Sequence, residues 1–93
     1  MVENPATWTD THLVIDKVIS KMVGPGASYG LIAEAICDEL HISYSYGNPV
    51  NLEPIFIVAV VVKQQYEMVD NYTCGLSLTA SVYNALKEAR YIK

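Results

Sequence analysis

Charged side chains are scarce in this sequence of 93 residues. They make up 17% of the chain, whereas hydrophobic residues make up 52%, and a typical domain has roughly 25% charged residues. This composition excludes a disordered segment, because disordered chains are highly charged and poor in hydrophobic residues. The length predicts a single domain over residues 1–93. Because a domain this small buries a limited share of its surface, we expect a second copy or another protein to cover part of its apolar surface.

Basic residues are especially few. Six lysines and arginines stand against ten acidic residues, which gives a formal net charge of −4. The basic residues cluster only at the C-terminal end, with Lys87, Arg90 and Lys93. Nucleic-acid-binding proteins usually carry a basic face or stripe that contacts phosphates. We therefore expect little affinity for nucleic acid, and the acidic charge favours a basic partner.

Cysteine is also rare, and Cys37 and Cys74 show neither a disulfide framework nor zinc-ligand spacing. Asp38 and Glu39 directly follow Cys37, and negative neighbours raise the pKa of a thiol. Two histidine–aspartate pairs provide too few ligands for zinc, which needs three or four; they are His12 with Asp16 and Asp38 with His41. With no recognisable acid–base pair or phosphate loop, the sequence predicts a non-enzymatic protein without metal, cofactor or catalytic residues.

The chain has no hydrophobic run long enough to cross a bilayer. Its longest apolar block, Pro54–Val62, falls well short of the about 20 residues that a transmembrane helix needs. Residues 1–15 lack the basic start and apolar core of a secretory signal, so we expect a cytoplasmic protein with reduced thiols. Because Pro54–Val62 is too apolar for a surface, we expect it to form the centre of the core, with Val60 buried.

Four segments have the apolar spacing of amphipathic helices. They are Trp8–Val23, Tyr29–Leu40, a segment of about 20 residues that begins after Asn51, and Leu78–Arg90. The expected N-terminal caps are Thr7 paired with Asp10, Ser28, Asn51 and Ser77. These segments predict an all-α, compact four-helix domain.

The third segment is the central element of this expected fold. Its β-branched block Ile55–Val62 also suits a buried strand, and periodicity alone does not decide between the two. No turn residue interrupts the segment before Asp70, so we favour a helix that is buried all round in its first half. The residues between the second and third helices form an expected loop, with a short extended segment near 42–46.

One stretch has a motif-like order of residues. Ile36–Ser43 resembles the end of the first helix and the turn of the helix-turn-helix family. The resemblance implies a DNA-binding transcriptional regulator with a recognition helix directly after the turn. Gly47 and Pro49 interrupt that segment, and it has no lysine or arginine for phosphates or bases. DNA binding is therefore the alternative function.

Leu78–Arg90 similarly looks like the reading helix of winged-helix regulators. Its two basic residues, Lys87 and Arg90, stand at the C-terminal end of the segment, whereas base contacts usually come from the N-terminal end. We therefore interpret this segment as an amphipathic helix that closes the core.

Tyrosine is the one enriched polar aromatic residue, with seven in the chain. Tyrosine and tryptophan are favoured at interfaces because they bury a large area and keep a polar group. Tyr44 and Tyr46 are the strongest candidates because their expected loop adjoins the acidic second helix. The full set of expected partner-binding residues is Trp8, Asp38, Glu39, Tyr44, Tyr46, Tyr83 and Tyr91. The sequence thus predicts a small homo-oligomeric or partner-binding module that regulates or inhibits another protein, a role that also suits a virus or mobile element.

Overall fold

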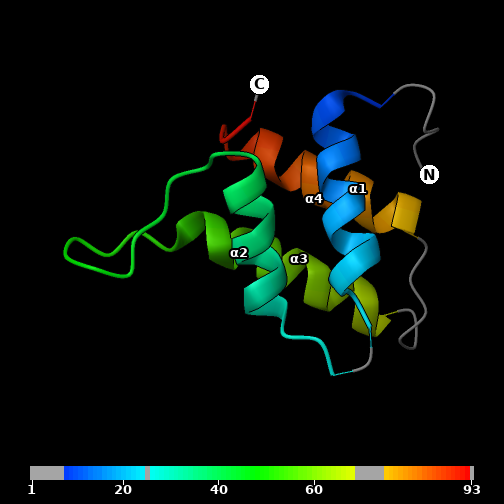
Figure 1. Ribbon diagram of the computed structural model, residues 1–93, viewed down its shortest axis with the longest axis horizontal. Helices are drawn as coiled ribbons and strands as arrows, with labels where there is room; N and C mark the ends of the chain where they lie inside the picture. Colours follow the sequence, from blue (N-terminus) through cyan, green and yellow to red (C-terminus); the bar gives the residue numbers. More distant parts are fainter. Residues whose placement is uncertain (1–7, 25, 69–74, 93) are drawn as a thin grey trace.

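Four α-helices follow one another along the part of the chain that the structure, a computed structural model, describes: residues 8–24, 26–68 and 75–92 (Figure 1). They are α1 (Asp10–Met22), α2 (Tyr29–Glu39), α3 (Glu53–Met68) and α4 (Gly75–Glu88). These described residues contain no strand, so the all-α fold expected from the sequence is confirmed. The expected extended segment is reduced to a single antiparallel bridge between Ser45 and Asn51.

The helices form two layers. α1 and α2 run in opposite directions in one layer, and α3 and α4 lie behind them with their axes across the first pair (Figure 1). α1 packs on α4, α2 packs on α3, and α3 also packs against α4. Each helix contributes fully buried side chains to the core between the layers; the largest are Ile15, Ile32, Ile36, Val58, Val62, Leu78, Val82 and Leu86.

α3 is helical over all of Ile55–Val62, the block for which periodicity alone did not decide between a helix and a strand. Val58 and Val62 are fully buried, but Phe56 is 62% exposed and Val60 is 51% exposed. The expectation that this helix is buried all round, with Val60 in the core, is therefore wrong. The reason is the two-layer packing, since α2 and α4 cover only part of the circumference of α3.

The start of α1 differs from the expected start. Thr9, not Thr7, is the N-cap: the backbone N–H of His12 donates to Thr9 Oγ1 at 3.4 Å, and the backbone N–H of Thr9 donates to His12 Nδ1 at 3.0 Å. This is a capping box in which an imidazole takes the place of the usual glutamate. Thr7 lies outside the described residues.

The other helix starts were predicted with mixed success. Ser28 caps α2 as expected, because its Oγ accepts a hydrogen bond from the backbone N–H of Leu31 at 3.3 Å. α4 begins at Gly75, so Ser77 lies inside the helix and is not its cap. Leu31, in the first turn of α2, is 58% exposed.

Two helices end in a Schellman motif around a residue that is not glycine. At the end of α2, His41 has φ 58, its N–H bonds to Asp38 O at 3.2 Å, and the N–H of Ile42 bonds to Cys37 O at 2.9 Å. At the end of α4, Arg90 has φ 67, and the N–H of Tyr91 bonds to Leu86 O at 2.9 Å. Each motif turns the chain back toward the core, where Ile42 is buried.

Candidate protein-interaction surface

The loop between α2 and α3 is held at both of its ends. Ile42, 8% exposed, anchors its start in the core. Near its end, Ser45 and Asn51 exchange two backbone hydrogen bonds of 2.8 and 2.9 Å. Inside this bridge the N–H of Gly47 donates to Ser45 Oγ at 3.1 Å, and the peptide bond before Pro49 is cis. The buried Ile42 and the bridge between Ser45 and Asn51 therefore hold Tyr44 and Tyr46 in defined positions.

Both loop tyrosines bind carboxylates of α2. The hydroxyl of Tyr44 donates to Asp38 Oδ1 at 2.8 Å, and the hydroxyl of Tyr46 donates to Glu34 Oε2 at 2.5 Å. Glu34 and Asp38 stand one helical turn apart, so they lie on one face of α2. The two rings meet edge to face with centroids 5.8 Å apart. We call these four residues the acidic–aromatic edge.

The hydrogen bonds raise the pKa of both tyrosines. The bond to Asp38 is the main cause that raises the pKa of Tyr44 to about 12, with loss of solvation and the negative charge of Asp38 adding to it. The bond to Glu34 likewise raises the pKa of Tyr46. Both hydroxyls therefore stay protonated to higher pH than an ordinary tyrosine and donate to the carboxylates. The edge offers anionic oxygens beside exposed aromatic carbon.

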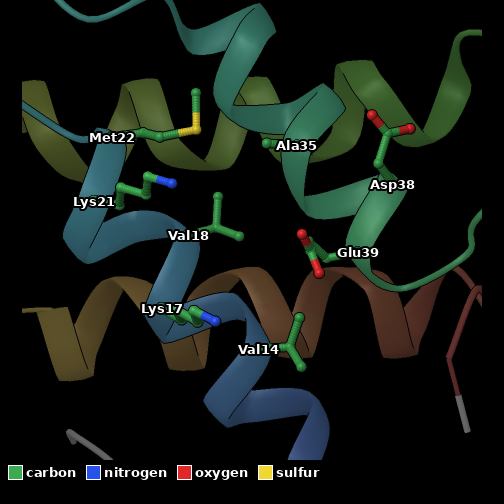
Figure 2. A pocket seen from close by; sticks show the side chains of 8 residues that line it. All are labelled: Val14, Lys17, Val18, Lys21, Met22, Ala35, Asp38 and Glu39. Carbon is green, nitrogen blue, oxygen red and sulfur yellow. The ribbon is translucent and has the colours of Figure 1, made fainter.

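The expected partner-binding residues fall into different places. Asp38, Tyr44 and Tyr46 come together in the edge, while Glu39 lies beside it on the wall of a groove between α1 and α2 (Figure 2). Trp8 and Tyr83 lie between α1 and α4 instead. The ring of His12 stacks on both: its centroid lies 5.5 Å from the ring centroid of Trp8 and 3.7 Å from that of Tyr83.

This second aromatic group is part of the packing between two helices. Tyr83 is 8% exposed, so only a small part of its ring is open to a partner, and Lys87 Nζ lies 5.9 Å from the centre of that ring. Nearby, the buried hydroxyl of Thr79 donates to Asp16 Oδ1 at 3.2 Å. The stacking of His12 on Tyr83 and the bond from Thr79 to Asp16 join α1 to α4.

Tyr91 also takes part in an internal contact. Its hydroxyl donates to Glu53 Oε1 at 2.5 Å and its ring packs against the core. This bond is the main cause that raises the pKa of Tyr91 to about 12, followed by loss of solvation. The contact ties the residue after α4 to the first turn of α3.

Glu34 is the member of the edge that sequence reasoning missed. Its spacing of one helical turn from Asp38 is a signal that could have identified it, since the two carboxylates must share a face of α2. The pairing of each tyrosine with a particular carboxylate has no such signal, because it depends on the path of the loop.

Cys37 is fully buried, and its thiol is held in the protonated form. Burial is the first cause that raises its pKa to about 11, and the negative charge of Asp38 is the second. Within the described part of the chain no group of three potential ligands could hold a metal ion. Cys74 lies outside the described residues.

Residues 44–52, where the helix-turn-helix resemblance would place a recognition helix, form a loop. Over the described ranges, no helix combines the length and the apolar character needed to cross a bilayer. Comparison of the chain with protein-family models, with curated proteins and with solved structures finds no match.

Proposed function

We propose that this chain is a small, non-enzymatic interaction module of the cytosol that self-associates and that binds a basic partner protein, whose activity it regulates or inhibits. The acidic–aromatic edge is the surface for the partner. The observation that carries the proposal is the pair of tyrosine–carboxylate bonds, which orders two anionic groups and two aromatic rings on one exposed face.

Arginine is the partner residue that this chemistry suits best. A guanidinium can donate to carboxylate oxygens while its plane stacks on an aromatic ring. Tyr46 is 59% exposed, which leaves its ring accessible to such stacking. Each carboxylate that accepts one tyrosine hydroxyl has further lone pairs for a guanidinium. The net charge of −4 adds long-range attraction for a basic protein.

A labelled arginine-rich peptide tests the partner surface by fluorescence anisotropy. The double variant Glu34→Gln/Asp38→Asn should weaken its binding strongly. The control variant Glu67→Gln/Glu88→Gln removes the same net charge from exposed positions of α3 and α4 and should weaken it only slightly. Equal losses in the two variants would show that the peptide responds to net charge alone, and the proposed surface would be wrong.

A lysine-rich peptide of the same length separates arginine recognition from simple charge attraction. Lysine lacks the planar group that stacks on tyrosine and pairs with two carboxylate oxygens. We expect the arginine peptide to bind more tightly, and we expect Tyr46→Ala to remove much of that difference. Stoichiometric binding to duplex DNA at low salt, with no binding of the peptide, would instead favour the DNA-binding alternative.

A further inference from the structure

The groove between α1 and α2 has walls of opposite charge. It encloses about 320 Å³ and is lined on α1 by Lys17 and Lys21, and on α2 by Asp38 and Glu39. Figure 2 shows both lysines reaching from α1 toward the space between the helices, and Glu39 reaching into it from α2. The apolar part of its lining is Val14, Val18, Met22 and Ala35.

The charged side chains of the two walls do not neutralise each other within one copy. Lys17, Lys21, Asp38 and Glu39 are all exposed. In the part of the chain that the structure describes, no ion pair joins the lysines of α1 to the acids of α2. The lysines accordingly remain free to pair with an anionic group outside the chain, and the acids with a cationic one.

Exposed leucines extend the apolar surface along both helices. Leu13 is 54% exposed and lies one helical turn before Lys17 on α1. Leu31 is 58% exposed and lies one turn before Ala35 on α2. The face made by α1 and α2 therefore combines an apolar lining, exposed leucines and two charged walls of opposite sign.

Such a face is complementary to itself. A two-fold axis that runs along the groove places α1 of one copy against α2 of the other, twice in the same dimer, because each contact in an isologous interface is repeated by symmetry. The lysine wall of each copy then meets the acidic wall of the other. A second copy of the chain carries both signs of charge in this arrangement.

We infer that the α1–α2 groove is the surface through which the chain forms a symmetric homodimer. The inference rests on the self-association in the proposed function and names its surface. Asp38 belongs to the groove wall and to the acidic–aromatic edge, so the two surfaces adjoin. Because the pairing charges are exposed, the dimer weakens as salt concentration rises.

Two charge-reversed variants test the surface by light scattering on a sizing column. Wild type should have twice the mass of the 10.3 kDa chain. Lys17→Glu/Lys21→Glu makes both walls acidic, and Asp38→Lys/Glu39→Lys makes both walls basic. Each variant alone should associate at least about 100-fold more weakly than wild type, because like charges then meet on both sides of the axis. An equimolar mixture of the two should restore the dimer, because every contact is again between opposite charges.

Control variants separate this effect from net charge and from folding. Lys63→Glu/Lys87→Glu changes the net charge by the same amount as Lys17→Glu/Lys21→Glu, but at exposed positions of α3 and α4. This control should leave the dimer intact. Asp38→Asn removes the charged acceptor of Tyr44 but does not reverse the charge of the α2 wall. It therefore separates the loss of that acceptor from the effect of charge reversal. Circular dichroism of each variant confirms that the helices are retained.

The outcomes also separate this inference from the proposed function. A wild-type chain that stays a monomer at high concentration would overturn both the groove and the self-association. A dimer that survives both reversals would overturn the groove alone. If Phe56→Asp then dissociates it, the interface lies on the exposed side of α3. A mixture that stays monomeric, although each variant is folded, would also overturn the symmetric pairing.

Discussion

The hydroxyl of Tyr46 donates a hydrogen bond of 2.5 Å to Oε2 of Glu34, across twelve residues of sequence. With the parallel contact of Tyr44 to Asp38, it joins an exposed loop to the acidic face of α2. A tyrosine that only filled the edge of the core would bury its ring, yet Tyr46 is 59% exposed. The ring is therefore held in place by its hydroxyl and stays accessible.

The alkaline titration of Tyr44 reports its bond to Asp38. In wild type the pKa of Tyr44 is about 12, and its ordinary value is 10.0. Asp38→Asn removes the negative charge, so the pKa of Tyr44 should fall toward 10.0. Tyrosinate absorbance followed against pH sums the titration of all seven tyrosines, so the change in Tyr44 is read as a difference between variants. Asp10→Asn, which alters an exposed acid in the first turn of α1, is the control. Identical titration curves for Asp38→Asn and Asp10→Asn would contradict the contact.

The contact between Tyr91 and Glu53 should make folding stability depend on alkaline pH. The folded-state pKa of Tyr91 is raised from 10.0 to about 12, so its neutral hydroxyl stabilises the fold fully below pH 10. This stability is lost as the pH rises from 10 through 12. Tyr91→Phe should lower the Tm at neutral pH and make the fall in Tm between pH 10 and 12 less steep. An unchanged slope would show that the hydrogen bond does not form in solution.

Cys37 should resist thiol reagents until the chain unfolds. A pKa of about 11 instead of 9.0 lowers the thiolate population at neutral pH about 100-fold, and burial blocks access as well. The measurement uses Cys74→Ser, in which Cys37 is the remaining thiol, and follows its reaction with a chromogenic disulfide with and without denaturant. Rapid reaction of the native protein would show that this part of the core opens readily.

A matched pair of substitutions on α3 tests which of its sides faces the core. Val58 is fully buried, so Val58→Asp places an unpaired charge in the core and should abolish cooperative unfolding. Val60 is 51% exposed, and Val60→Asp should leave a folded helical protein. Circular dichroism and thermal melting compare the two variants. If Val60→Asp also fails to fold, the orientation of α3 described above, with Val60 facing outward, is contradicted.

His41 offers a stabilising substitution. Its φ of 58 places a side chain in the left-handed region, where glycine is strongly favoured at the end of a helix. His41→Gly should raise the free energy of unfolding by up to about 1 kcal/mol. His41→Ala keeps the strained Cβ and should give no such gain. Denaturant unfolding of both variants checks the prediction, and a larger gain from alanine would indicate that the imidazole itself is unfavourable.

Local features of the sequence predicted most of the helical structure. Ser28 and the apolar spacing of Ile32 and Ile36 placed α2 within one residue at its C-terminal end. The unbroken run from Pro54 onward predicted one long helix rather than a strand. These signals act within a few residues along the chain, because capping bonds and helical faces are formed by close neighbours in sequence.

The acidic–aromatic edge was only partly predictable, because these sequence signals act within a few residues and the edge joins a loop to a helix. The acidic second helix and the tyrosines after it were visible as composition, and Asp38, Tyr44 and Tyr46 do lie together. Tyr83 carries the same chemical signal as Tyr46, yet it stacks on His12 between two helices. Their neighbours in sequence place Tyr46 in a loop and Tyr83 in a helix, but the burial of each ring depends on which helices meet.

The sequence by itself determined four helices and the acidic character of α2, because each follows from residues adjacent along the chain. For Cys37 it supplied only the negative neighbour Asp38, and the burial that is the main cause of its raised pKa came from the tertiary structure. The tertiary structure alone decided that Phe56 and Val60 face outward and that Tyr46 reaches Glu34. It also decided that Lys17 lies across a groove from Glu39. The physical reason is that two crossed layers cover only one side of each helix. Which side is covered depends on the other helices and not on the helix's own composition.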